Sequence, residues 1–74
     1  MTLFNVKVGE KVTVSGYTLS AYYRKKLAKF GITDNCVITV LGVSPFGGTQ
    51  KISVNGVNFA VGKKISEGII VKYV

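Results

Sequence analysis

The stretch Ile52-Ser53-Val54-Asn55-Gly56-Val57-Asn58-Phe59 decides the fold. Both central positions of a type I′ turn need positive φ, which Asn and Gly tolerate best, so Asn55-Gly56 predicts a two-residue turn. This turn places four apolar side chains on one face of a hairpin: Ile52, Val54, Val57 and Phe59. Ser53 then lies opposite Asn58 on the other face, so that the turn and the polarity pattern agree on one register. The stretch predicts an antiparallel hairpin.

Further short strands are predicted on both sides of the hairpin. Lys11 to Ser15 alternates polar and apolar residues, as a half-buried strand does, and the glycine that follows ends or bulges it. Cys36 to Val43 is a β-branched run with too little alternation for one exposed face. Gly42 predicts a bulge in this run, beyond which Val43 is expected to rejoin the core. Ile69 to Val74 is expected to form the last strand.

A basic helix is predicted between the first two strands, over the run Tyr22 to Ile32. Its apolar residues recur at spacings of four, four and three, which places them on one face, toward the core: Leu19, Tyr23, Leu27 and Phe30. Ser20 is a suitable N-cap, and Gly31 a suitable left-handed C-cap.

These elements and the chain length predict one small domain over residues 1–74. A chain of 74 residues with 47% hydrophobic content can bury roughly 60% of its unfolded surface in a single core. About five short strands and one early helix fit a mainly β fold. We expect a small SH3-like antiparallel barrel of about five strands, with one short α-helix inserted after the first strand.

Composition argues against an enzyme and against a metal or cofactor site. The chain has no His, one Cys and three acids, Glu10, Asp34 and Glu67, which are scattered along the sequence. A metal site needs several converging ligands, and acid-base catalysis needs paired or perturbed groups. Cys36 lies in an apolar run and is expected to pack as a small hydrophobe. We therefore expect no catalytic residue, no metal and no cofactor.

Charge and terminal sequence indicate a cytoplasmic protein with an anionic partner. Ten Lys and Arg residues against three acids give a net charge of +7, which favours encounter with anionic molecules and also keeps a small domain soluble. The N-terminal sequence has no signal-peptide pattern, and no apolar run approaches the length of a membrane span. No membrane insertion is expected.

Two exposed segments are the candidate partner-binding residues. On a helical wheel Tyr22 lies beside Lys25 and Lys29, with Arg24 further round, which makes an aromatic within a basic patch. In the other segment, Pro45-Phe46-Gly47, a bulky aromatic is placed at a loop tip. The alternatives are that Tyr22 lies along lysine stems and that Phe46 folds back as a lid over the barrel. We hypothesise that both segments form one docking surface.

The order of these motifs resembles the FeoA family, the ferrous-iron transport protein A. The residues that carry the resemblance are the helix core Arg24-Lys25-Lys26-Leu27 with Phe30-Gly31-Ile32-Thr33, the strand Val37 to Val43, the loop Ser44-Pro45-Phe46-Gly47, and the hairpin Ile52-Ser53-Val54-Asn55-Gly56. The family's Pro-Leu-Gly-Asp-Pro loop is here Pro45-Phe46-Gly47-Gly48-Thr49, without its acid and one proline. A related module forms the C-terminal domain of metal-dependent repressors similar to the diphtheria-toxin repressor.

The resemblance implies a cytoplasmic SH3-like domain that is an accessory to a membrane ferrous-iron transporter. Its partner would be the transporter's cytoplasmic GTP-binding domain, which would recruit it to the inner face of the membrane. The alternative function is a nucleic-acid-binding SH3-like module that uses its basic surface. Only one Arg is present and no strand face carries a row of aromatics, so nucleic acid is the weaker candidate. The exposed edges of a small open barrel could also add a strand from a partner or from a second copy.

Overall fold

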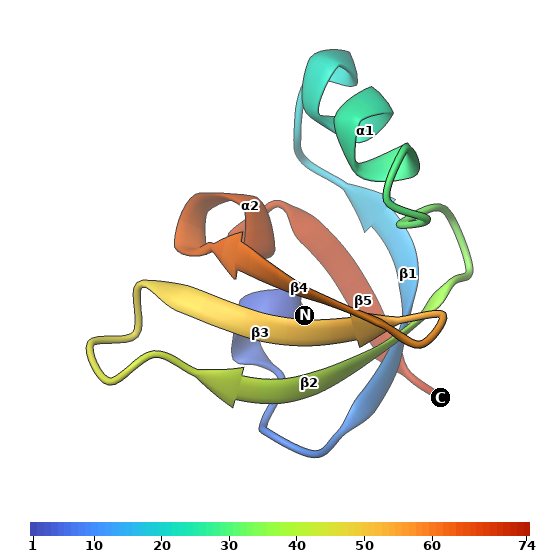
Figure 1. Ribbon diagram of the computed structural model, residues 1–74. Helices are drawn as coiled ribbons and strands as arrows, with labels where there is room; N and C mark the ends of the chain where they lie inside the picture. Colours follow the sequence, from blue (N-terminus) through green and yellow to red (C-terminus); the bar gives the residue numbers. More distant parts are fainter.

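A computed structural model describes residues 1–74. The five strands form one antiparallel sheet in the order β4-β3-β2-β1-β5 (Figure 1). The elements, in chain order, are a 3-10 turn Leu3–Asn5, β1 Lys11–Tyr17, α1 Ala21–Ala28, β2 Val37–Val43, β3 Thr49–Val54, β4 Val57–Gly62, α2 Lys63–Glu67 and β5 Ile69–Tyr73. The mainly β fold with a helix after the first strand is confirmed. The expected barrel is not closed, because β4 and β5 are the two edges of the sheet.

The predicted hairpin forms in the predicted register between β3 and β4. Ile52 lies opposite Phe59, and Val54 lies opposite Val57. Asn55 and Gly56 have φ of 53° and 80°, the two positive values that a type I′ turn requires. Ile52 and Val54 are buried, so the hairpin presents its apolar face to the core.

Both predicted strand irregularities are present, but one expected consequence is wrong. The register of β1 against β5 shifts between Val14 and Gly16, and that of β2 against β3 shifts between Val40 and Gly42. Beyond the second bulge Val43 lies opposite Gln50, yet 48% of Val43 is exposed. Val43 therefore does not rejoin the core, although Gln50 opposite it is buried.

The core is one cluster of thirteen buried apolar residues drawn from all the strands, the N-terminal segment and the α1 region. Two buried polar side chains complete it. Gln50 on β3 donates through Nε2 to the carbonyl oxygen of Leu3 at 2.9 Å, and its Oε1 accepts a 2.9 Å bond from Ser66 Oγ. These bonds join three segments: the 3-10 turn, β3 and α2. Helix α2 was not predicted from the sequence, which gave only a connection there.

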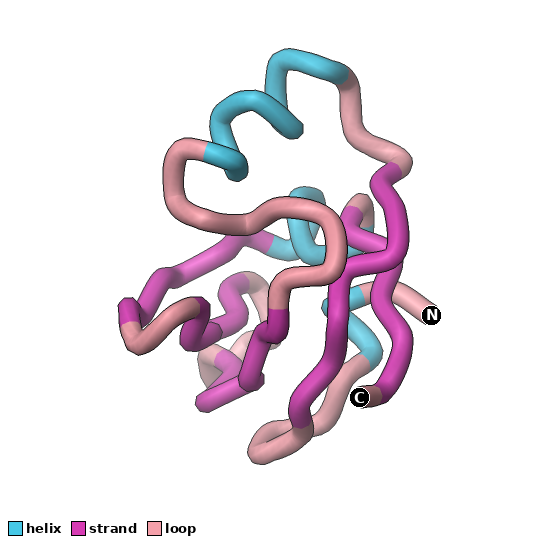
Figure 2. The backbone as a smooth tube through the Cα atoms, turned by 90° about the vertical axis from the view of Figure 1, so that its right-hand side faces the viewer, coloured by secondary structure: helices cyan, strands magenta, loops and turns pink.

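The predicted glycine, Gly31, closes the C-terminal end of helix α1. The amide of Gly31 donates to the carbonyl of Ala28, and the amide of Ile32 to that of Leu27, while Gly31 has φ of 86°. This is the Schellman pattern, in which two crossing bonds satisfy the last carbonyls of a helix. Ser20 holds the N-cap position, but its side chain makes no capping bond. Both views show α1 held outside the sheet by its two connecting loops (Figures 1 and 2).

Candidate functional site

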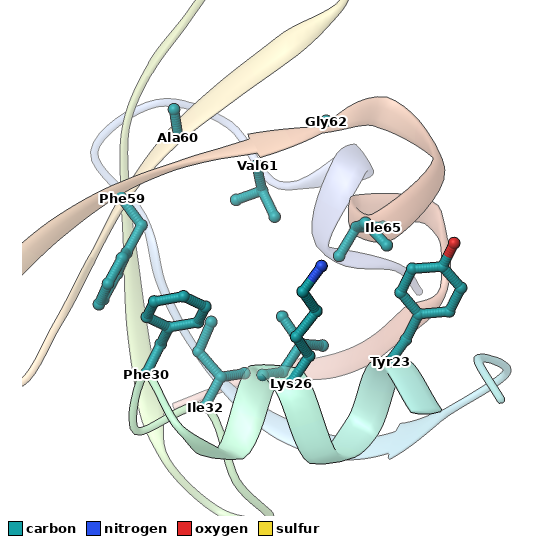
Figure 3. Close-up of a pocket in the computed structure, with 10 residues that line it drawn as sticks. Tyr23, Lys26, Phe30, Ile32, Phe59, Ala60, Val61, Gly62 and Ile65 are labelled. Carbon is teal, nitrogen blue, oxygen red and sulfur yellow. The ribbon is translucent and has the colours of Figure 1, made fainter. Parts of the chain in front are cut away.

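An open groove lies between α1 and the edge of the sheet (Figure 3). Its volume is about 370 Å³, and eight of its ten lining residues are hydrophobic. The lining comes from α1 and the turn after it, from β4 and from α2: Tyr23, Lys26, Leu27, Phe30, Ile32, Phe59, Ala60, Val61, Gly62 and Ile65. The groove exists because α1 stands away from the sheet and only Leu27 of the helix is buried.

Two aromatic residues expected in the core form walls of this groove instead. Tyr23 is 43% exposed and Phe30 is 52% exposed, whereas Leu27 is buried. Of the four residues predicted to face the core, Leu27 is buried and Leu19 packs against the core partly buried, whereas the prediction is wrong for the two aromatic residues. Phe30 packs against Phe59 of β4, with ring centroids 5.3 Å apart and planes at 63°. The helical stripe faces the sheet as predicted, but the groove separates it from β4, so Tyr23 and Phe30 remain accessible.

One cation enters the groove, and no acid lines it. In Figure 3 the side chain of Lys26 points from α1 into the space below Val61 and Ile65. Its Nζ also lies 5.6 Å from the ring centroid of Tyr22. Lys26 is exposed and no acid lines the groove, so its ammonium favours an anionic group on whatever occupies the groove.

The four helix residues predicted to bind a partner lie on or beside α1. Tyr22 is 65% exposed, as predicted, and its edge packs on Tyr23 with ring centroids 5.3 Å apart. Arg24 and Lys25 line a shallower hollow on another side of the helix. Lys29, the C-cap residue, is exposed and directly precedes Phe30.

The shallower hollow carries both signs of charge. Asp34 lines it together with Arg24, Lys25 and Tyr17. Burial raises the pKa of the Tyr17 phenol above its ordinary value, with a smaller contribution from Asp34. The Tyr17 hydroxyl donates to the carbonyl of Ile32 at 3.3 Å, so its polar atom is used inside the fold.

The loop residues Pro45-Phe46-Gly47 project into solvent between β2 and β3. Phe46 is 100% exposed, so the alternative in which it folds back over the barrel does not hold. The loop is ordered by Ser44: its carbonyl accepts from the amide of Gly47 at 2.9 Å, and its Oγ accepts from the amides of Gly48 and Thr49 at 3.0 and 3.1 Å. A fixed turn thus presents an isolated aromatic ring.

The structure does not bring the helix and loop candidates together. The end of α1 lies at the hairpin end of the sheet, since Phe30 packs on Phe59 and Gly31 lies beside Asn55. Phe46 follows the opposite end of β2 (Figure 1). The seven residues therefore form two separate exposed areas. Whether either one binds a partner stays a prediction.

No group of three or more His, Cys, Asp or Glu side chains gathers in a way that could hold a metal ion. Cys36 is only partly buried, and burial raises the pKa of its thiol, which disfavours the thiolate. None of the helices is long and apolar enough to cross a membrane.

Sequence reasoning found neither the groove nor the roles of Lys26, Phe59 and Ile65 in it. The groove joins segments that are far apart in the chain, and no local pattern reveals that α1 stands off the sheet. One signal was available: Tyr23, Leu27 and Phe30 are large residues for a core that a 74-residue chain can build.

Comparison with known proteins gives a consistent result. A family model, the FeoA domain, matches residues 1–73. The crystal structure of the iron uptake regulatory protein FeoA is 31% identical with a TM-score of 0.88, covering 100% of this chain and 96% of that one. The FeoA protein from Chlorobium tepidum is 24% identical with a TM-score of 0.93, covering 100% and 70%.

A similar fold occurs within a larger protein. A manganese-dependent transcriptional repressor is 19% identical with a TM-score of 0.89, covering 100% of this chain and 41% of that one. A search of curated proteins finds no significant match. The match to the family model over nearly the whole chain, together with the FeoA structures, shows that this chain belongs to the FeoA family.

Proposed function

We propose that this protein is a cytoplasmic accessory of a ferrous-iron transport system and acts by binding the transporter's cytoplasmic GTP-binding domain. Membership of the FeoA family and the likeness to an iron uptake regulatory protein support the link to iron. In this proposal iron is the cargo of the transporter, and this chain contributes a binding surface rather than a reaction.

The observation that carries the proposal is the groove between α1 and β4. Large exposed apolar side chains are normally buried on binding, and Tyr23 and Phe30 stand at the rim of a groove that the chain itself leaves empty. Lys26 adds a charge that selects an acidic partner. Binding can alter the transporter only if the affinity differs between two of its conformations.

A titration with a matched pair of charge reversals tests this proposal. The purified chain is titrated by calorimetry into the cytoplasmic domain of the ferrous-iron transporter from the same organism. Lys26→Glu places a negative charge in the groove, whereas Lys72→Glu makes the same change in total charge on β5. We expect saturable binding that Lys26→Glu weakens by about tenfold and Lys72→Glu changes far less. No binding by the unmodified chain contradicts the proposal.

Binding of nucleic acid is the second candidate, favoured by the net charge of +7. The same chain titrated with duplex DNA and with single-stranded RNA near physiological salt decides between the two. A nucleic-acid ligand gives affinity that falls steeply and linearly in log-log form with salt concentration. Such a slope, without binding to the transporter domain, replaces the first proposal.

A further inference from the structure

The groove has an unusual wall: four consecutive residues of one strand, Phe59 to Gly62, line it. Successive side chains of a strand point to opposite faces, so side chains alone cannot account for four neighbours in one lining. In Figure 3 the side chains of Phe59 and Val61 point toward the groove, while the methyl group of Ala60 points away from it. Ala60 therefore lines the groove with its backbone.

The hydrogen-bond register of the hairpin shows which backbone groups face outward. In a two-residue hairpin the residues that flank the turn, Val54 and Val57, exchange both bonds, and every second pair after them does the same. The bond from the amide of Lys63 to the carbonyl of Gly48 continues this pattern past the end of the strands. The amides and carbonyls of Asn58 and Ala60 consequently point away from β3. None of the backbone bonds outside the helices and the sheet involves either residue.

The other edge of the sheet, β5, is partly covered by the N-terminal segment. Thr2 forms a bridge with Ile70 of β5, and the amide of Val71 donates to the carbonyl of Met1 at 2.9 Å. The N-terminal segment thus covers part of β5, whereas β4 has no neighbour on its outer side. An open edge with unpaired amides and carbonyls is a template for a further strand.

The charge of the groove selects the chemistry of that strand. Lys26 enters the groove, Lys63 and Lys64 follow β4 directly, and no acidic residue lines the groove. A second copy of this chain would bring a further charge of +7 and the same lysines to the interface. A strand whose groove face is apolar, with one acidic residue on that face near Lys26, would instead bury its apolar side chains between Phe30, Phe59 and Ile65.

We propose that an extended segment of the partner protein, with apolar side chains on its groove face and an acidic residue at the position of that face nearest Lys26, adds to β4 as a sixth strand and fills the groove below α1. The segment pairs with Asn58 and Ala60 over about six residues, the length of β4. Main-chain bonds supply affinity, the apolar pocket supplies register, and Lys26 supplies the preference for acid. This inference rests on the proposed function, because it names the mode by which the transporter domain is bound.

The first test uses a synthetic peptide as the probe. The peptide has about eight residues, with valine or phenylalanine at the alternate positions that face the groove, glutamate in place of one of these, and threonine at the positions between. One control peptide has the same sequence with N-methyl groups on its central amides, and another has lysine in place of glutamate. We expect the first peptide to bind and each control to bind at least about tenfold more weakly. Equal binding of the N-methylated peptide refutes strand addition, and equal binding of the lysine peptide refutes the charge preference.

The second test changes β4 itself and keeps the internal fold. Ala60→Pro removes an amide hydrogen that β3 does not use and places the proline ring on the outer edge, where strands tolerate proline. Ala60→Ser, the matched control, retains the amide. We expect Ala60→Pro to weaken both the peptide and the transporter domain by about tenfold or more, and Ala60→Ser to change neither by more than a few-fold. Circular dichroism checks that each variant is folded, and the N-methylated peptide tests the same bonds without any variant.

The outcomes separate this inference from the proposed function. If the transporter domain binds the unmodified chain and Ala60→Pro equally, the accessory role stands and strand addition is refuted. If the peptide binds with the expected controls and the transporter domain does not, the groove takes an extended acidic segment of another protein, and the accessory role fails. If ultracentrifugation shows a dimer that Ala60→Pro abolishes, the occupant is a second copy and the proposal is wrong.

Discussion

Replacing Gln50 by leucine tests the buried polar bridge that holds α2 against the sheet. Gln50 is 1% exposed, and its amide bonds both the Leu3 carbonyl and the Ser66 hydroxyl at 2.9 Å. Leucine has a similar size, so Gln50→Leu removes the bonds without leaving a large cavity. Because Gln50 pairs with Val61, and Ser66 follows Ile65, this bridge also supports one wall of the groove.

The structure sets the size of the effect. The Ser66 hydroxyl loses its acceptor while fully buried, which costs about 1–3 kcal/mol. The Leu3 carbonyl still accepts from the amide of Val6. Loss of its bond to Gln50 therefore costs about 0.5–1.5 kcal/mol, as for an ordinary hydrogen bond. Added apolar burial by leucine returns about 1 kcal/mol. The net loss is about 0.5–3.5 kcal/mol, against a total of roughly 4–11 kcal/mol for a chain of this length.

Thermal unfolding followed by circular dichroism measures this loss. For a domain of this size a loss of 1 kcal/mol lowers Tm by about 4–8 °C, so Gln50→Leu should lower it by at least about 2 °C. Ser66→Ala alone leaves Gln50 Oε1 unpaired, whereas the double variant leaves no unpaired side-chain atom. The double variant should therefore be no less stable than either single one. If Gln50→Leu is as stable as the parent, or if the two losses simply add, the bridge does not have the role described.

Three further predictions concern the helix ends and the titratable groups. A Cβ at Gly68 would overlap the Leu19 side chain, so Gly68→Ala should lower the free energy of unfolding by about 1–3 kcal/mol, and adding Leu19→Ala should restore part of it; urea unfolding without such rescue contradicts the overlap. Gly31→Ala should cost about 1–2 kcal/mol at φ of 86°, and an unchanged urea midpoint opposes the assigned helix end. Burial raises the pKa of the Cys36 thiol and of the Tyr17 phenol above their ordinary 9.0 and 10.0. The folded state therefore holds these protons more tightly, so this contribution to the free energy of unfolding is full below about pH 9 and is lost as the pH rises further. A urea unfolding midpoint that stays constant above about pH 9 refutes this.

The sequence was sufficient to predict local structure where a residue type strongly favours one backbone conformation. Asn55-Gly56 requires a tight turn, and the side-chain alternation around it then leaves a single register, which the structure has. Gly31 likewise determines where α1 ends, through its positive φ. Gly42 predicted the bulge that the structure has in β2, but the expected lack of an exposed face is wrong, since Val37 and Leu41 are 45% and 41% exposed.

The sequence was insufficient where the outcome depends on how segments pack. Tyr23 and Phe30 lie on the predicted helical stripe, but whether that stripe is buried depends on the distance between α1 and the sheet. Val43 is an apolar, β-branched residue of the kind found in cores, yet 48% of it is exposed. The α2 residues Lys63–Glu67 show no periodicity, since five residues are too few to show one.

The candidate site was predicted in part. The exposure of Tyr22 follows from its position on the helical wheel, and that of Phe46 from its place at a loop tip; the structure has both. The groove could not be predicted, because it depends on the unpaired edge of β4, and a strand's position in the sheet follows from the whole topology.

Amide hydrogen exchange of this chain in complex with the transporter's cytoplasmic domain tests the central claim most directly. Residue-resolved exchange distinguishes amides that already bond β3 from those that face outward. If a partner strand adds at the open edge, the amides of Asn58 and Ala60 gain protection, while those of Phe59 and Val61 change little. Protection confined to the Phe46 loop, or none anywhere at saturating partner, contradicts the claim.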